Sequence, residues 1–155
     1  MHDGLVVLLH DVSSAQRLID TARLVYGLGL RSFVASKVYG AAASSGVPEA
    51  SRMAMKLGRL FAVLPSARDA VELLQPDAVI VVSRDYGEPL EASEIAEKLA
   101  KAKKPLLVLG GIDAAPSKDV AALGEALYIA GVEHRLGPVA EAAIILAALR
   151  GLSRP

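Results

Sequence analysis

The segment Pro105-Leu-Leu-Val-Leu-Gly-Gly-Ile-Asp113 is an apolar run that stops at two glycines, and Tyr128-Ile-Ala-Gly131 repeats this pattern further along the chain. Short apolar runs bounded by glycine are typical of buried parallel strands. Each glycine leaves bare backbone N–H and C=O groups at the carboxyl end of its strand, where α/β sheets bind ligands. The two segments therefore predict a cofactor pocket at one edge of a parallel sheet.

Similar apolar runs alternate with helical patterns along the rest of the chain. Strands are expected at residues 5–10, 31–36, 60–64, 77–82, 106–109 and 127–129. Helices are expected from Ser13 or Ser14 to Gly27, then at residues 48–57, 66–74, 91–104 and 137–149, whereas residues 37–47 and 83–89 are expected to be loops. This alternation predicts an α/β fold with a doubly wound parallel sheet of five or six strands. We expect one domain spanning residues 1–155.

Composition excludes several classes of protein. The 155 residues are 53% hydrophobic, but no apolar run approaches the roughly 20 residues of a membrane span. The first ten residues lack the pattern of a signal peptide, so we expect a cytoplasmic protein with no membrane partner. The absence of cysteine excludes disulfides and thiolate chemistry. There is no G-x-G-x-x-G, phosphate loop or G-x-S-x-G elbow, which argues against dehydrogenases, kinases and hydrolases.

Charge is balanced overall but unevenly distributed. The formal net charge is zero, which argues against a protein held on nucleic acid by its overall field. Residues 1–59 nevertheless carry seven basic and four acidic side chains, whereas residues 60–155 carry ten and thirteen. The positive half of the chain either meets phosphates or is an ordinary solvated surface.

Three blocks of sequence share a wider pattern. The first, Arg17-Leu-Ile-Asp-Thr-Ala-Arg-Leu-Val-Tyr-Gly-Leu-Gly29, is followed by a predicted strand. The second is Leu107-Val-Leu-Gly-Gly-Ile-Asp113, and the third joins Ile129-Ala-Gly131 to Leu136-Gly-Pro-Val-Ala-Glu-Ala-Ala-Ile-Ile-Leu146. Together they resemble the SPOUT (SpoU-TrmD) superfamily of RNA methyltransferases. Arg23 falls on the arginine of the family's N-x-G-x-x-x-R-T-A-x-x-F-G pattern, but Gly137 and Val139 replace an asparagine and a serine of the third block.

The resemblance implies a carboxyl-terminal trefoil knot over residues 105–137, a homodimer built partly from a helix at residues 137–150, and S-adenosylmethionine as cofactor. It implies methylation of a ribose 2′-oxygen or a base in tRNA or rRNA. Residues 37–59 and the partner subunit would then bind the RNA. Periodicity alone would not suggest a knot, because true knots are rare.

The resemblance also assigns roles to single residues. Cofactor-binding residues would be Ser83, Gly110, Gly111, Ile129, Gly131 and Leu136, mainly through their backbone groups. Arg23 would lower the pKa of a ribose hydroxyl or bind a phosphate, unless it merely pairs with Asp20 or Glu49 at the surface. His134 would act as a base, because imidazole changes charge near neutral pH, or would be an exposed bystander. No metal site is expected from the three histidines.

Two alternatives stay open at this point. One is a protein of the same fold that binds RNA or a nucleotide without methylating it. The other is a nuclease-like α/β enzyme that holds a divalent metal through Asp77, Asp85, Glu88 and Asp113, although these four lack a recognisable ligand spacing.

Overall fold

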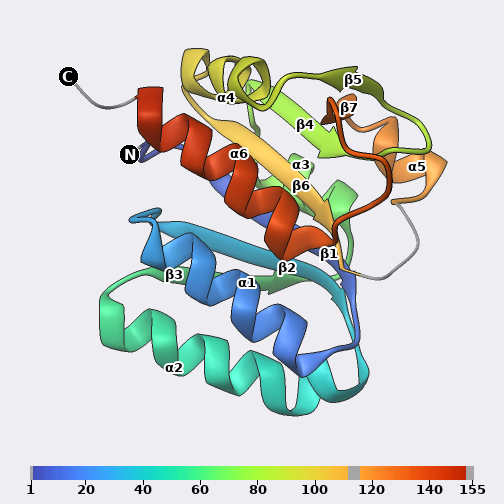
Figure 1. Cartoon of the computed structure of the whole chain (residues 1–155). Helices are drawn as coiled ribbons and strands as arrows, with labels where there is room; N and C mark the ends of the chain where they lie inside the picture. Colours follow the sequence, from blue (N-terminus) through green and yellow to red (C-terminus); the bar gives the residue numbers. More distant parts are fainter. Residues whose placement is uncertain (1, 112–115, 153–155) are drawn as a thin grey trace.

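All the strands of the computed structural model, which describes residues 2–111 and 116–152, join one parallel sheet. The strands within those residues are β1 (Val6–Val12), β2 (Ser32–Val38), β3 (Leu60–Leu64), β4 (Ala78–Val82), β5 (Glu88–Leu90), β6 (Pro105–Gly110) and β7 (Glu125–Ile129). Their order across the sheet is β3-β2-β1-β6-β4-β7-β5 (Figure 1). Because every pair is parallel, all carboxyl ends meet at one edge.

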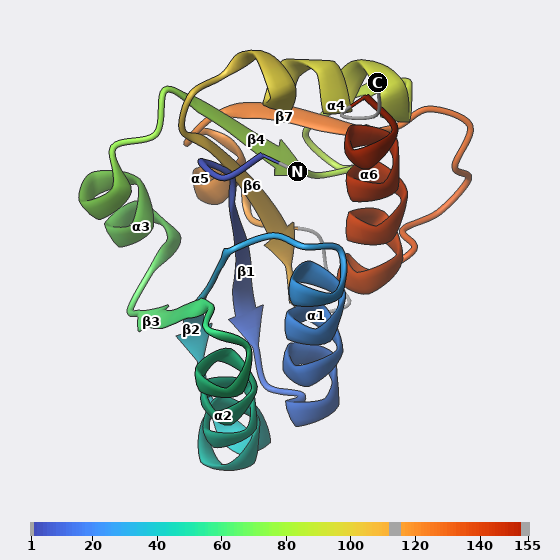
Figure 2. The same ribbon diagram turned by 90° about the vertical axis from the view of Figure 1, so that its left-hand side faces the viewer.

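Helices cover both faces of the sheet, as a parallel sheet requires. One face carries α1 (Ala15–Gly27), α2 (Val47–Leu57), α4 (Ala92–Lys101) and α6 (Pro138–Leu152), while α3 (Ala67–Leu74) and the short α5 (Lys118–Ala121) lie on the other (Figures 1 and 2). The doubly wound α/β fold predicted from the alternating pattern is confirmed. No helix in the described part of the chain is both long and apolar enough to span a bilayer.

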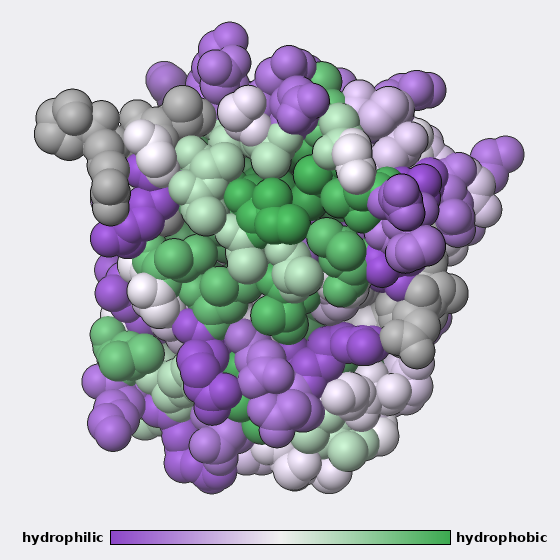
Figure 3. Space-filling model, viewed as in Figure 1, coloured by the Kyte–Doolittle hydropathy of each residue, from purple (hydrophilic) through white to green (hydrophobic). Residues whose placement is uncertain are grey.

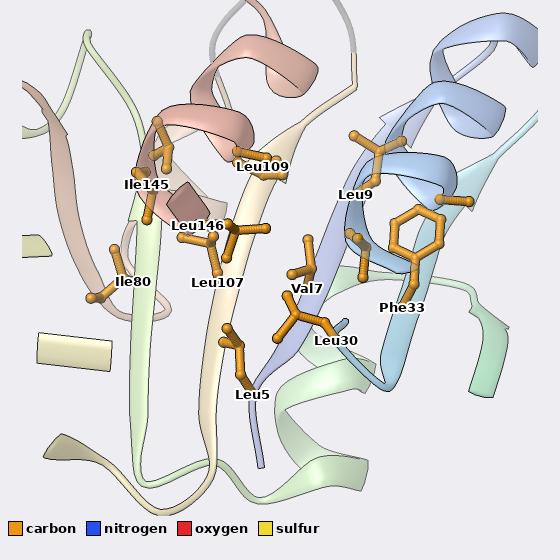
Figure 4. Packing of buried hydrophobic residues seen from close by; sticks show 14 of the residues in the cluster. Leu5, Val7, Leu9, Leu30, Phe33, Ile80, Leu107, Leu109, Ile145 and Leu146 are labelled. Carbon is orange, nitrogen blue, oxygen red and sulfur yellow. The ribbon is translucent and has the colours of Figure 1, made fainter. Parts of the chain in front are cut away.

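The larger of two cores fills the space between the sheet and the α1/α6 layer. Leucines of the two central strands, including Leu9, Leu107 and Leu109, pack there against Ile145 and Leu146 of α6 (Figure 4). These side chains are fully buried, and each stabilises the fold by about 1.5–3 kcal/mol relative to full exposure. The central strands are buried on both faces, which explains why they read as continuous apolar runs rather than alternating ones.

Local signals placed most elements correctly. The Ser14 hydroxyl accepts the Arg17 N–H at the start of α1, and the Ser66 hydroxyl accepts the Asp69 N–H at the start of α3. Gly58 ends α2 in the left-handed conformation.

Three predictions from the sequence were wrong in detail. The sheet has seven strands rather than five or six, because residues 83–89, expected to be a loop, lead into β5, which pairs with β7. Residues 37–47 were expected to form a mobile loop, but they continue β2 and then form a π-helical turn, Ala42–Gly46, leading into α2. That turn packs on α1, with Ala42 and Gly46 buried, so tertiary contact outweighs the Gly/Ala/Ser composition. The knot over residues 105–137 stays a prediction.

Candidate functional site

A small hollow, with a free volume of about 10 Å³, lies at the carboxyl edge of the sheet, beside the ends of β4 and β7. The hollow is lined by Arg84, just after β4, by the end of β7, by the loop between β7 and α6, and by the first turn of α6. Figure 1 shows where these elements lie. The lining residues are Arg84, Tyr128, Ile129, Val132, His134, Arg135, Leu136 and Glu141. It is therefore a mixed surface, with an aromatic ring, aliphatic side chains and charges of both signs.

Arg84 crosses this hollow. Its guanidinium carbon lies 4.9 Å from the centroid of the Tyr128 ring, a cation–π arrangement. The same guanidinium donates a hydrogen bond to the backbone oxygen of Val132. Arg84 thus joins the end of β4 to β7 and to the loop that follows it.

Glu141 is the buried carboxyl group of the hollow. It lies in the first turn of α6 and is only 7% exposed. Burial raises the pKa of Glu141 from its usual 4.5 to about 7, and the opposing charge of Arg135 offsets part of this shift. Near neutral pH this carboxyl is poised between its two protonation states, a property that is common among functional groups.

Three of the predicted site residues line this hollow, namely Ile129, Leu136 and His134. His134 and Leu136 lie in the exposed part of the β7–α6 loop, whereas Ile129 is buried at the end of β7. Five lining residues were missed: Arg84, Tyr128, Val132, Arg135 and Glu141. Two signals in the sequence were available, because Arg84 follows an apolar strand directly and Glu141 is a lone acid in an apolar helix.

The remaining predicted cofactor residues lie around the hollow rather than on its wall. Ser83 is buried, and its hydroxyl accepts the N–H of Tyr86, which shapes the turn that presents Arg84. Gly131 turns the β7–α6 loop with a φ of 88°. A Cβ atom on Gly110 would lie 3.3 Å from the Arg135 guanidinium, so this glycine gives Arg135 room beside the sheet.

Both backbone groups of Gly111 form hydrogen bonds within the protein. Its N–H donates to the backbone oxygen of His10 at 2.7 Å, and its own oxygen accepts from the Arg17 guanidinium at 2.9 Å. A Cβ atom here would lie 2.7 Å from the Asp11 oxygen, so close packing of β6 on β1 requires glycine. In this arrangement, neither backbone group of Gly111 is turned toward a ligand.

Arg23 lies apart from the hollow. Its side chain is 65% exposed and forms an ion pair with Asp20 at 3.0 Å, one turn away on the same helix. Arg17, six residues nearer the carboxyl edge, is the α1 arginine that touches the Gly110-Gly111 turn. The structure therefore places Arg23 in the surface pairing that the sequence had offered as the alternative to catalysis.

A second polar cluster lies at the ends of β1 and β2. Asp11 and Lys37 lie between the last two paired positions of β1 and β2, their Oδ2 and Nζ atoms are 3.5 Å apart, and their φ angles are positive, at 66° and 50°. Such angles are strained in non-glycine residues and gather at functional sites. In the preceding pair of residues, Nδ1 of the His10 ring lies 2.8 Å from the Ser36 hydroxyl, and burial lowers the pKa of His10.

Asp77 and Asp85, two of the four carboxylates of the nuclease alternative, are not brought together. The Asp77 carboxylate accepts the N–H groups of Lys103 and Lys104 at the opposite edge of the sheet, and these bonds lower its pKa. Asp85 lies beyond the other end of β4, a strand of five residues that spans roughly 16 Å. Asp113 lies outside the described residues. Within residues 2–111 and 116–152, no three acidic or histidine side chains form a candidate metal site.

Residues 40–148, more than half of the chain, match the sequence model of a family described as "RecB-family nuclease (DUF2122)". The chain belongs to this family. A protein of Aeropyrum pernix, named "Putative type II restriction enzyme", is 47% identical over 141 residues, which cover 91% of this chain and 89% of that protein.

Solved structures with the same fold carry different names. A "probable methylase family protein" from Haemophilus influenzae superposes with a TM-score of 0.75 at 19% identity, covering 97% of this chain and 66% of that one. The SpoU methyltransferase AviRb from Streptomyces viridochromogenes, in complex with AdoMet, gives a TM-score of 0.74 at 17% identity, covering 98% and 61%. The chain thus spans about two thirds or less of these structures. At this identity the likeness shows the fold alone, which is that of the SpoU methyltransferases.

Proposed function

We propose that this protein binds S-adenosylmethionine in the hollow beside β7 and methylates RNA. The observation that carries the proposal is the lining of that hollow in a sheet of SpoU-methyltransferase fold. Tyr128 offers an aromatic face, Arg135 can bind a carboxylate, and Glu141 can face a sulfonium cation. This set of groups fits a ligand that has an aromatic ring and charges of both signs.

When bound, the cofactor supplies an electrophilic methyl group, so the protein's own residues have to hold the acceptor, remove its proton and exclude water. His134 lies on the exposed part of the lining, where it can take a proton from an acceptor hydroxyl or amine. The roles of Arg23 and of the predicted backbone contacts of Gly110, Gly111 and Gly131 remain predictions.

The homodimer is part of this proposal. Helix α6 is apolar on nearly every side, and its Ile144 is 38% exposed. The face of the molecule that carries α6 shows an apolar patch (Figure 3). Exposed apolar patches of this kind commonly mark protein–protein contacts. A second copy of the chain packed on α6 would cover it. Sedimentation of wild type and Ile144→Glu tests this, because the charged variant is expected to be a monomer.

Cofactor binding is the first test of function. Calorimetry with S-adenosylmethionine is expected to give a micromolar dissociation constant, and transfer of a labelled methyl group to bulk tRNA or rRNA is the second test. His134→Ala should keep cofactor binding and lose methyl transfer. Failure of the wild-type protein to bind the cofactor would overturn the proposal.

A phosphodiester-cleaving nuclease is the second candidate, and the Asp11–Lys37 pair favours it together with the name of the family. A carboxylate beside a lysine at the strand ends could bind a metal-activated water and a phosphate. Incubating DNA and RNA with the protein and Mg²⁺ tests this activity. Cleavage lost in Asp11→Asn would favour the nuclease over the methyltransferase.

A further inference from the structure

Arg84 makes two contacts in the hollow that a bound purine would also make. Its planar guanidinium lies over the Tyr128 ring, and one of its N–H groups donates to the Val132 oxygen. A purine would stack on the same aromatic face, and an exocyclic amine would donate to the same carbonyl. Arg84 therefore makes, within the protein, the two kinds of contact that an adenine ring would make with it.

The size of the hollow agrees with this interpretation. Its free volume of about 10 Å³ holds roughly one water molecule and lies far below the roughly 300–1,000 Å³ of pockets that enclose small-molecule ligands, so a purine could enter only if part of the lining moved away. Two of its walls are fixed, since Ile129 is buried on β7 and Glu141 is buried on α6, and the Ser83 hydroxyl accepts the Tyr86 N–H and so holds the turn that carries Arg84. The long side chain of Arg84 is only partly buried, so it can move away without unfolding an element.

We infer that Arg84 gates an adenine site: in the ligand-free protein it occupies the place of the adenine ring, and a 6-aminopurine nucleoside replaces both of its contacts. This inference rests on the proposed cofactor. A ligand must displace the cation–π contact and the hydrogen bond together, so a ring that lacks the amine leaves the Val132 oxygen facing no donor. Arg84 thus weakens the binding of every purine by a similar amount, and the Val132 oxygen favours adenine among them.

Adenosine is the sharpest probe, because it carries the purine and lacks the carboxylate that an arginine could bind. Calorimetry with adenosine should show that Arg84→Ala binds about tenfold more tightly than wild type, which corresponds to about 1.4 kcal/mol. Arg84→Lys should also bind more tightly, because a lysine lacks the planar donor fork. Inosine, with a carbonyl in place of the amine, should bind each protein more weakly than adenosine does. Arg68→Ala, an exposed arginine of α3 on the other face of the sheet, is the control and should match wild type.

The outcomes separate this inference from the function on which it rests. If S-adenosylmethionine and adenosine bind to wild type but Arg84→Ala binds adenosine equally or less tightly, Arg84 is a ligand-binding residue and the gate is refuted. Equal affinity for inosine and adenosine would refute the role of the Val132 oxygen. If neither compound binds to wild type or to Arg84→Ala, the proposed cofactor fails and the gate fails with it.

Discussion

Replacing Glu141 by glutamine should stabilise the protein at alkaline pH and have almost no effect in acid. Burial raises the pKa of this carboxyl from 4.5 to about 7, so the folded chain holds a proton that the unfolded chain has lost between these two pH values. The stability of wild type therefore falls as pH rises through this window. A shift of about 2.5 pH units corresponds to a cost of up to about 3 kcal/mol above pH 7.

Urea unfolding at pH 4.5, 6 and 8 measures this effect. Glu141→Gln should gain up to about 3 kcal/mol over wild type at pH 8, roughly half of that or more at pH 6, and little at pH 4.5. Glu97→Gln, which removes an exposed carboxylate of α4, controls for the general loss of a charge. A difference between Glu141→Gln and wild type that does not change with pH would refute the reasoning, because it would mean that the carboxyl has no unusual titration in the folded state.

Three further predictions concern the strand ends and caps that position the site. Lys37 has a φ of 50°, which glycine adopts more easily than alanine, so urea unfolding should show that Lys37→Gly is more stable than Lys37→Ala by about 1 kcal/mol. Both variants lose the ion pair with Asp11, so the comparison isolates the backbone. Equal stabilities would rule out strain at this residue. Gly111→Ala places a Cβ atom 2.7 Å from the Asp11 oxygen and should lower the free energy of unfolding by about 2 kcal/mol, whereas Gly27→Ala, with open space around the added atom, should be neutral or stabilising. Ser66→Ala removes the side-chain cap of α3 and should lower the free energy of unfolding by about 1 kcal/mol, which a lower melting temperature would reveal. An unchanged melting temperature would show that the cap does not stabilise the protein.

Most of the architecture could be predicted from the sequence because its signals are local. The short apolar runs, the capping serines and the helix-ending Gly58 each report on a few neighbouring residues. Strand β5 carries no such signal, since its three residues include an exposed proline and it is a strand only because β7 lies beside it. The turn at residues 42–46 likewise depends on packing against α1.

The site was predicted less well than the fold. Residues of the β7–α6 loop were found through a family resemblance, and Ile129, His134 and Leu136 do line the hollow. Arg84 was missed because it is far from that loop in sequence and reaches it only through the neighbouring positions of β4 and β7. The pKa of Glu141 depends on burial, which composition does not reveal.

The strand order has a consequence for biosynthesis. Strand β5 hydrogen-bonds to β7 alone among the described strands, and β7 leaves the ribosome more than thirty residues later. The β1, β2 and β3 ladder uses only early residues, so it can assemble while the rest of the chain is still being made. The edge that carries the Arg84 hollow is therefore completed last, and until β7 is made one side of β4 has no partner strand and could engage other polypeptides.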